Sequence, residues 1–149
     1  MVDPGFSQAL DYSFKLLALR ARSRWEIESR LKLKKHPARI VTRVRDHLLA
    51  RGFLDDSNFS RMYIAYCCGK GWGRRRIEAG FRRSGVAKEV YQGFLPGKAE
   101  TREKLRELIA RKSAYYEGKK NAYQKLVRFL AGRGFESEEI LRELEGFKT

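Results

Sequence analysis

The 149-residue chain is strongly basic, because 33 lysines and arginines stand against 18 aspartates and glutamates and give a formal net charge of +15 at pH 7. Hydrophobic residues make up 42% of the chain and aromatic residues 12%, a composition that excludes a disordered chain and can fill a core. The charge indicates a polyanionic partner, whether nucleic acid, an acidic protein or a membrane surface.

The first third of the chain, residues 1–53, has apolar residues at helical spacing. Three helices are predicted from the following sets, each of which lies on one helix face: Leu10, Phe14 and Leu17; Ile27 and Leu31; Ile40, Val44 and Leu48. Ser23 and Glu26 form a capping box at the start of the second helix. Pro37 suits the first position of the third helix, and Gly52 followed by Phe53 is typical of a left-handed helix end.

Residues 54–96 repeat this pattern. Their helices are predicted from Phe59, Tyr63 and Tyr66, then Ile77 and Phe81, then Val90 and Phe94. Asp55 and Asp56 could bind Mg²⁺ or act as acid and base, but no third ligand or base accompanies them. A turn and helix N-cap before Phe59 explains the two aspartates better. Gly85 followed by Val86 is a second predicted helix end.

Residues 97–149 contain a third set of helices. The apolar sets are Leu105, Leu108 and Ile109; Tyr123, Leu126, Val127 and Leu130; and Ile140, Leu141, Leu144 and Phe147. Gly134 followed by Phe135 predicts a helix end. Ser137, with Glu138 and Glu139 after it, predicts an N-cap with acidic charge at the positive end of the helix dipole.

The three segments are related by a period of about 50 residues. Ile27 corresponds to Ile77, and Ile40 to Val90 and then to Ile140. Self-similarity at this period is typical of stacked helical units. We therefore predict an all-α fold of three tandem three-helix repeats, residues 1–53, 54–96 and 97–149, which form an elongated, curved array. No coiled-coil seam is present, so a monomer is expected.

Two basic segments occupy related places, each at the turn into the second helix of its repeat. They are LALRARSRWE (17–26) and GKGWGRRRIE (69–78). Their cations could bind phosphates or acidic side chains, or could simply line solvated turns; they are Arg20, Arg22, Arg24, Lys70, Arg74, Arg75 and Arg76. Trp72 could stack on a base, but a packing role is favoured because most large aromatic residues are buried.

Catalytic and metal-binding patterns are absent from the sequence. Cys67 and Cys68 lack a second ligand pair for zinc, and the only histidines, His36 and His47, are distant from them. GKGWGR lacks the spacing of a phosphate-binding loop. We expect no enzyme activity, metal or cofactor. Without an apolar span or a signal-peptide pattern, we also expect a cytoplasmic protein with no membrane partner.

Four ordered segments resemble the RecX family, whose members regulate the RecA recombinase. They are LLALRARS (16–23), ARGFLDDSNFSRMYI (50–64), GWGRRRIEAGFRRSGV (71–86) and KLVRFLAGRGFESEEI (125–140), and the resemblance runs from about Leu16 to Leu144. It implies three-helix repeats and binding to the RecA filament on single-stranded DNA, with double-stranded DNA a further candidate. The implied effect is modulation, usually inhibition, of RecA's ATPase, strand-exchange and coprotease activities, and hence regulation of homologous recombination, DNA repair and the SOS response.

The resemblance also suggests which residues are structural and which make contacts. Positions that match the family pattern and are expected to be structural are Ser23, Gly52, Asp55, Asp56, Phe59, Gly73, Ile77, Gly85 and Gly134. The candidates for contact with protein or DNA are Arg20, Arg22, Arg24, Lys70, Trp72, Arg74, Arg75, Arg76, Arg82, Arg83 and Arg133. Two departures are Ser60 in place of the usual alanine and Gly80-Phe81 in place of Glu-Leu. The alternative function is that of an autonomous basic helical DNA-binding protein.

Overall fold

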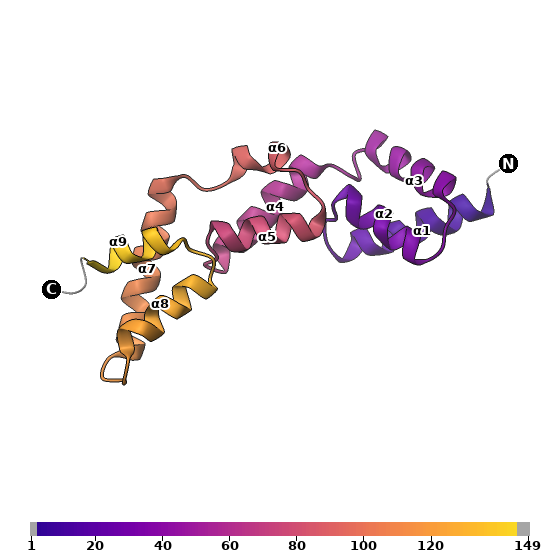
Figure 1. Ribbon diagram of the computed structural model, residues 1–149. Coiled ribbons are helices and arrows are strands. Elements are labelled where there is room, and N and C mark those ends of the chain that lie inside the picture. Colours follow the sequence, from indigo (N-terminus) through magenta and orange to yellow (C-terminus); the bar gives the residue numbers. More distant parts are fainter. Residues whose placement is uncertain (1–2, 146–149) are drawn as a thin grey trace. The chain divides into compact units, whose positions relative to one another are not determined.

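A computed structural model describes residues 3–145 of the chain, and in this range all regular structure is helical (Figure 1). The predicted all-α fold is confirmed. Phe147, expected on the last helix, lies outside the described residues. The described residues divide into two compact units, 3–63 with 81–93 and 64–80 with 94–145.

The first unit contains the bundle of α1 (Pro4–Leu19), α2 (Arg24–Leu33) and α3 (Ala38–Ala50). Their apolar faces meet in one core, which comprises Ala9, Leu16, Ile27, Leu31, Ile40, Val41, Val44, Leu48 and Leu54. Asp3 caps α1, because its carboxylate accepts a hydrogen bond from the Gly5 N–H. Pro37 is the N-cap of α3 instead of its first residue, since its ring fixes only φ and its ψ of 150° is extended.

The middle repeat contributes to both units, because α4 (Asp56–Gly69) and α5 (Arg74–Ser84) each cross the division between them. Its third helix is short: α6 (Lys88–Tyr91) continues only into the 3-10 turn η1 (Gln92–Phe94). In the first unit, the Phe81 ring stacks on Tyr91 at 4.1 Å and meets Tyr63 edge to face at 5.0 Å. Phe81 is fully buried. Its aromatic contacts therefore fill the core beside Gly80, the neighbouring residue of α5 that has no side chain to contribute.

The second unit contains the bundle of α7 (Lys98–Tyr116), α8 (Ala122–Gly132) and α9 (Ser137–Glu145). Its core comprises Leu105, Leu108, Ile109, Leu126, Leu130, Phe135, Ile140 and Leu144. The helix α9 begins at Ser137, and the Glu136 carbonyl accepts the first hydrogen bond, from the Ile140 N–H. The N-cap is therefore Glu136 and the prediction of Ser137 was one residue off, although Glu138 and Glu139 do lie in the first turn.

Helices in every repeat end in the same way. Gly52, Gly85 and Gly134 have φ values of +76°, +68° and +97°, as predicted for left-handed helix ends. The next residue donates to a carbonyl five residues back in each case, as Phe53 does to Leu48 and Phe135 to Leu130. These bonds tie each turn to the backbone carbonyl of a buried residue in the preceding helix.

Candidate functional site

The turn between α1 and α2 exposes two of its three arginines. Arg20 pairs with Glu26 at 2.6 Å and Arg24 lies 3.9 Å from Glu28, and both guanidinium groups reach solvent. Arg22 is only 9% exposed, and its Nε donates to the Leu16 carbonyl near the end of α1 at 3.3 Å. Burial lowers the pKa of Arg22. The Arg22 side chain is thus used to bind a carbonyl in the last turn of α1, so Arg20 and Arg24 are the better placed for a partner.

The start of α2 is held by contacts with the middle repeat. Ser23 accepts from the Glu26 N–H in the predicted capping box, and its own hydroxyl donates to the Ser84 carbonyl at 2.5 Å. The Arg24 N–H donates to Asp56 at 2.9 Å. A Cβ on Gly85 would lie 2.3 Å from the Cγ of Trp25, so α2 packs directly on the turn after α5.

The start of α5 is held in the same way by the third repeat. The Gly73 N–H donates to the Arg133 carbonyl at 2.6 Å, and the Arg75 N–H donates to the Gly134 carbonyl at 3.0 Å. A Cβ on Gly134 would lie 2.5 Å from the Cβ of Arg76, and one on Gly73 would lie 2.7 Å from the Gly134 backbone. We call each of these two contacts a repeat joint: the start of one repeat's second helix packs on the glycine turn of the next repeat.

Cations and aromatic rings gather around the turn between α4 and α5. The Arg76 guanidinium lies 3.9 Å from the Trp72 ring centroid, and Trp72 meets Tyr66 edge to face at 5.7 Å. The Lys70 ammonium lies 5.7 Å from the Tyr66 centroid, and Arg133 donates to the Lys70 carbonyl at 3.3 Å. We call Tyr66, Lys70, Trp72 and Arg76 the turn cluster. Trp72 is half-buried in it and Tyr66 is exposed.

The remaining arginine candidates lie on α5 and differ in their engagement. Arg74 pairs with Glu78 one turn later at 2.7 Å. Arg75 in the second unit, and Arg82 and Arg83 in the first, are exposed on their helix. Within residues 3–145 these three guanidinium groups have no hydrogen bond or ion pair. They are therefore available to an anionic partner at little cost of lost internal contacts.

The other positions expected to be structural lie in the core or at helix ends. Asp55 caps α4, because its carboxylate accepts from the N–H groups of Ser57 and Asn58. Phe59 and Ile77 are buried. Ser60, which departs from the family pattern, is buried as well, and its hydroxyl donates to the Asp56 carbonyl at 2.7 Å. This bond satisfies the hydroxyl, so the departure leaves no unpaired polar group.

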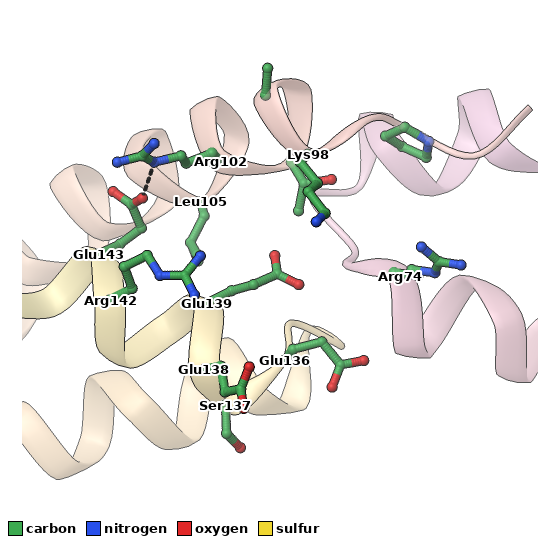
Figure 2. A pocket seen from close by; sticks show the side chains of 13 residues that line it. Arg74, Lys98, Arg102, Leu105, Glu136, Ser137, Glu138, Glu139, Arg142 and Glu143 are labelled. Carbon is green, nitrogen blue, oxygen red and sulfur yellow. Dashed lines mark hydrogen bonds and ion pairs between the residues drawn. The ribbon is translucent and has the colours of Figure 1, made fainter.

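A hollow of about 800 Å³ opens in the second unit between the first turns of α7 and α9 (Figure 2). Glu139 extends into it from α9, and burial together with the charge of Glu136 raises the pKa of Glu139. One helical turn further along α9, Glu143 also lines the hollow. It is 8% exposed and accepts from Arg102 at 2.5 Å and Arg106 at 2.8 Å. Burial acts to raise the pKa of Glu143, but these two hydrogen bonds and charges outweigh it and lower that pKa.

Features of other functional classes are lacking in the part of the chain that the structure describes. No three histidine, cysteine, aspartate or glutamate side chains there are grouped to hold a metal ion. Burial raises the pKa of the Cys68 thiol, which is the opposite of what a reactive thiolate needs. Among residues 3–145, no helix is both long and apolar enough to cross a bilayer.

Comparison with known proteins adds family membership to this geometry. The model of the first three-helix domain of RecX matches residues 9–48, and that of the third three-helix domain matches residues 100–144. A regulatory protein RecX from Mycolicibacterium vanbaalenii is 32% identical over 139 residues, which are 86% of this chain and 76% of the relative. The chain belongs to the RecX family.

Further RecX proteins are similar over most of their length. The regulatory protein RecX of Vibrio vulnificus is 28% identical, with 92% of this chain and 91% of the relative covered. The crystal structure of RecX from Lactobacillus salivarius has a TM-score of 0.81 and 17% identity, with 97% of each chain covered, which shows the same fold. A regulatory role and a fold of three-helix repeats are therefore established for this RecX-family chain.

Two features of the site were not predicted from the sequence. One is the role of Arg22 and Arg76 within the protein. A charged residue in a basic segment gives no sign that its side chain binds the end of the preceding helix, as Arg22 does, or packs on the turn of the next repeat, as Arg76 does. The other is a second group of cations and rings at Lys112 and Tyr115 on α7 and Lys119 in the turn after it. The spacing of three residues between Lys112 and Tyr115 was the available signal, since it places these two on one helix face.

Proposed function

We propose that this RecX-family protein binds the RecA recombinase filament on DNA and modulates it, with inhibition of ATPase, strand exchange and coprotease activity as the expected direction. The observation that supports the proposal is the set of exposed guanidinium groups without internal partners on α5, at Arg75, Arg82 and Arg83. Filaments on DNA present carboxylates and phosphates, which arginine binds in bidentate fashion. Membership of the RecX family is the reason for choosing RecA as the proposed partner among such filaments.

The test is the DNA-dependent ATPase of the cognate recombinase with increasing amounts of this protein. Variants Arg75→Glu and Arg82→Glu/Arg83→Glu remove exposed charges without disturbing known contacts. Arg74 and Arg76 are left intact, because Arg74 pairs with Glu78 and Arg76 packs on Trp72 and Gly134. Lys15→Glu, on the exposed side of α1, is the control for net charge.

We expect the wild type and Lys15→Glu to lower the ATPase rate and the α5 variants to lower it less. An unchanged rate at concentrations where binding to the filament is demonstrated would defeat the inhibitory form of the proposal. Equal inhibition by the wild type and all three variants would show that these arginines of α5 do not contact the filament.

The second candidate is autonomous DNA binding, favoured by the contacts between cations and aromatic rings in the turn cluster. It predicts tight binding to naked DNA that does not depend on recombinase. Weak binding that falls steeply with salt would instead indicate an accessory contact to the DNA within a filament.

A further inference from the structure

The end of the third repeat formed by the α7–α8 turn is much more basic than the rest of that repeat. Between residues 111 and 133 there is a single acidic residue, Glu117, against seven lysines and arginines: Arg111, Lys112, Lys119, Lys120, Lys125, Arg128 and Arg133. The other acidic residues of the repeat lie earlier on α7 or along α9 and the turn before it. The charges are thus segregated within one small bundle.

Cations and aromatic rings alternate along this basic end. The Lys119 ammonium lies 3.6 Å from the Tyr115 centroid, and the Lys112 ammonium lies 5.2 Å from Tyr115 and 4.8 Å from Phe129. The Phe129 ring is also contacted by Arg133, whose guanidinium lies 5.0 Å from the ring centroid. We call Lys119, Tyr115, Lys112, Phe129 and Arg133 the hairpin row, since they come from α7, α8 and the turns that follow them.

The hairpin row continues into the turn cluster within the same unit. Arg133 is the link, because its guanidinium both contacts Phe129 and donates to the Lys70 carbonyl at 3.3 Å. Lys70 in turn contacts Tyr66. Tyr115 is 60% exposed and Tyr66 is 54% exposed, so two of the rings offer much of their surface to solvent.

We propose that the hairpin row binds single-stranded nucleic acid, with the Tyr115 ring stacking on a base and Lys112 and Lys119 contacting phosphates. Alternating rings and cations suit a single strand, whose bases have open faces at intervals along a charged backbone. The bases of a duplex are stacked on one another and offer only phosphates to such a surface. The inference deepens the proposed function and rests on it only for the identity of the nucleic acid as DNA.

An acidic protein surface is the competing ligand. It would use the lysines and would gain little from the exposed face of Tyr115, because a carboxylate is repelled by the negative face of an aromatic ring. Loss of the ring therefore separates the two ligands, whereas loss of a lysine does not.

The experiment measures binding of the full-length protein to a short fluorescein-labelled oligothymidylate and to a duplex of the same length, by fluorescence anisotropy over a salt series without recombinase. Variants are Tyr115→Ala, Tyr115→Phe and Lys119→Ala. Lys34→Ala is the matched control, because Lys34 also lies over a tyrosine ring, 5.3 Å from Tyr12, but in the first unit. Thermal unfolding of each variant checks that it is folded.

We expect Tyr115→Ala to weaken binding to the single strand by roughly five- to a hundredfold, and Tyr115→Phe to bind as the wild type does. Lys119→Ala should reduce the slope of log K against log salt by about 0.7, and Lys34→Ala should change nothing. Wild-type affinity in folded Tyr115→Ala, or equal affinity for duplex and single strand, would overturn the inference. Because recombinase is absent, failure of the ATPase test leaves this result standing, and the reverse also holds.

Discussion

The hydroxyl of Ser23 donates to the carbonyl of Ser84 at 2.5 Å, and this bond joins the first repeat to the second. One period later, the Gly73 N–H donates to the Arg133 carbonyl at 2.6 Å and joins the second repeat to the third. The same joint is thus made by a side chain in one case and by the backbone in the other. Substitutions at either joint should therefore act on repeat packing as well as on a helix end.

Replacing Ser23 by alanine should be costly. Ser23→Ala removes the capping box of α2 and leaves the Ser84 carbonyl without its donor, for a loss of about 2 kcal/mol in the free energy of unfolding. Urea unfolding followed by circular dichroism measures this loss. Ser137→Ala is the control, since Ser137 is a helical residue and not the N-cap, and we expect less than about 0.5 kcal/mol for it. Equal losses would show that neither the capping box nor the Ser84 contact contributes to stability.

The glycines at the joints should tolerate no side chain. Gly85→Ala places a Cβ 2.3 Å from Trp25, and Gly134→Ala places one 2.5 Å from Arg76, both at a positive φ. Strain and overpacking together should cost about 2 to 4 kcal/mol. Gly52→Ala separates the two effects, because its φ is +76° but nothing lies within 4 Å, so the expected loss is only about 1 kcal/mol. Similar unfolding midpoints for all three variants would contradict the packing argument.

Lys35→Gly should stabilise the protein. Lys35 has a φ of +65° and stands where the second and third repeats have Gly85 and Gly134. Glycine removes the strain of a side chain in the left-handed region, and we expect a gain of about 1 kcal/mol in the free energy of unfolding. Lys32→Gly, within α2, is the opposite control and should lose about 1 kcal/mol. A destabilised Lys35→Gly would mean that the lysine makes contacts that outweigh its strain.

Two glutamates on α9 should respond to charge removal in opposite directions. The pKa of Glu143 is lowered in the folded protein, so its carboxylate stabilises the fold above the pKa that it has in the unfolded chain. Glu143→Gln should lose about 1 kcal/mol at neutral pH. This is below the usual range for bonds to charged groups, because the exposed Arg102 and Arg106 can turn to water. The pKa of Glu139 is raised, so Glu139→Gln should leave stability unchanged or improve it.

Acid unfolding gives an independent check of the same pair. The contribution of Glu143 is lost as pH falls through its lowered folded-state pKa, so the difference between wild type and Glu143→Gln should disappear at acid pH. The difference between wild type and Glu139→Gln should also shrink there, because a protonated Glu139 no longer holds a charge in the hollow. Persistence of the Glu143→Gln deficit at acid pH would show that packing, not charge, causes it.

Local chemistry made several features of the helix ends predictable. The capping box at Ser23, the N-cap at Asp55 and the left-handed Gly85 and Gly134 each depend on residues close in sequence. The left-handed Lys35 was open to prediction too, since the 50-residue period aligns it with Gly85. Boundaries were less certain, and the N-caps of α3 and α9 each lie one residue from the expected pattern, because neighbouring positions satisfy the same capping geometry.

The roles of the basic residues could not be read in this way. Arg20, Arg22 and Arg24 are the same residue type in one basic segment. Only Arg22 is buried, because its side chain binds a carbonyl near the end of α1. Similarly, Arg75 is unengaged while Arg76 packs on Trp72 and against Gly134. The end of its own repeat's first helix holds Arg22, whereas the turn of the next repeat, distant in sequence, holds Arg76.

The sequence by itself determined the helices, their repetition and the family, because helical periodicity, caps and stop glycines are local and recur with a fixed period. Only the tertiary structure decided that Ser23 and Gly73 hold the same joint, that Gly85 and Gly134 leave room for a neighbouring helix, and that Lys112 lies between Tyr115 and Phe129. These relations arise when helices distant in the chain bury their apolar faces against each other, and the polar groups at their edges then meet partners that no local pattern specifies.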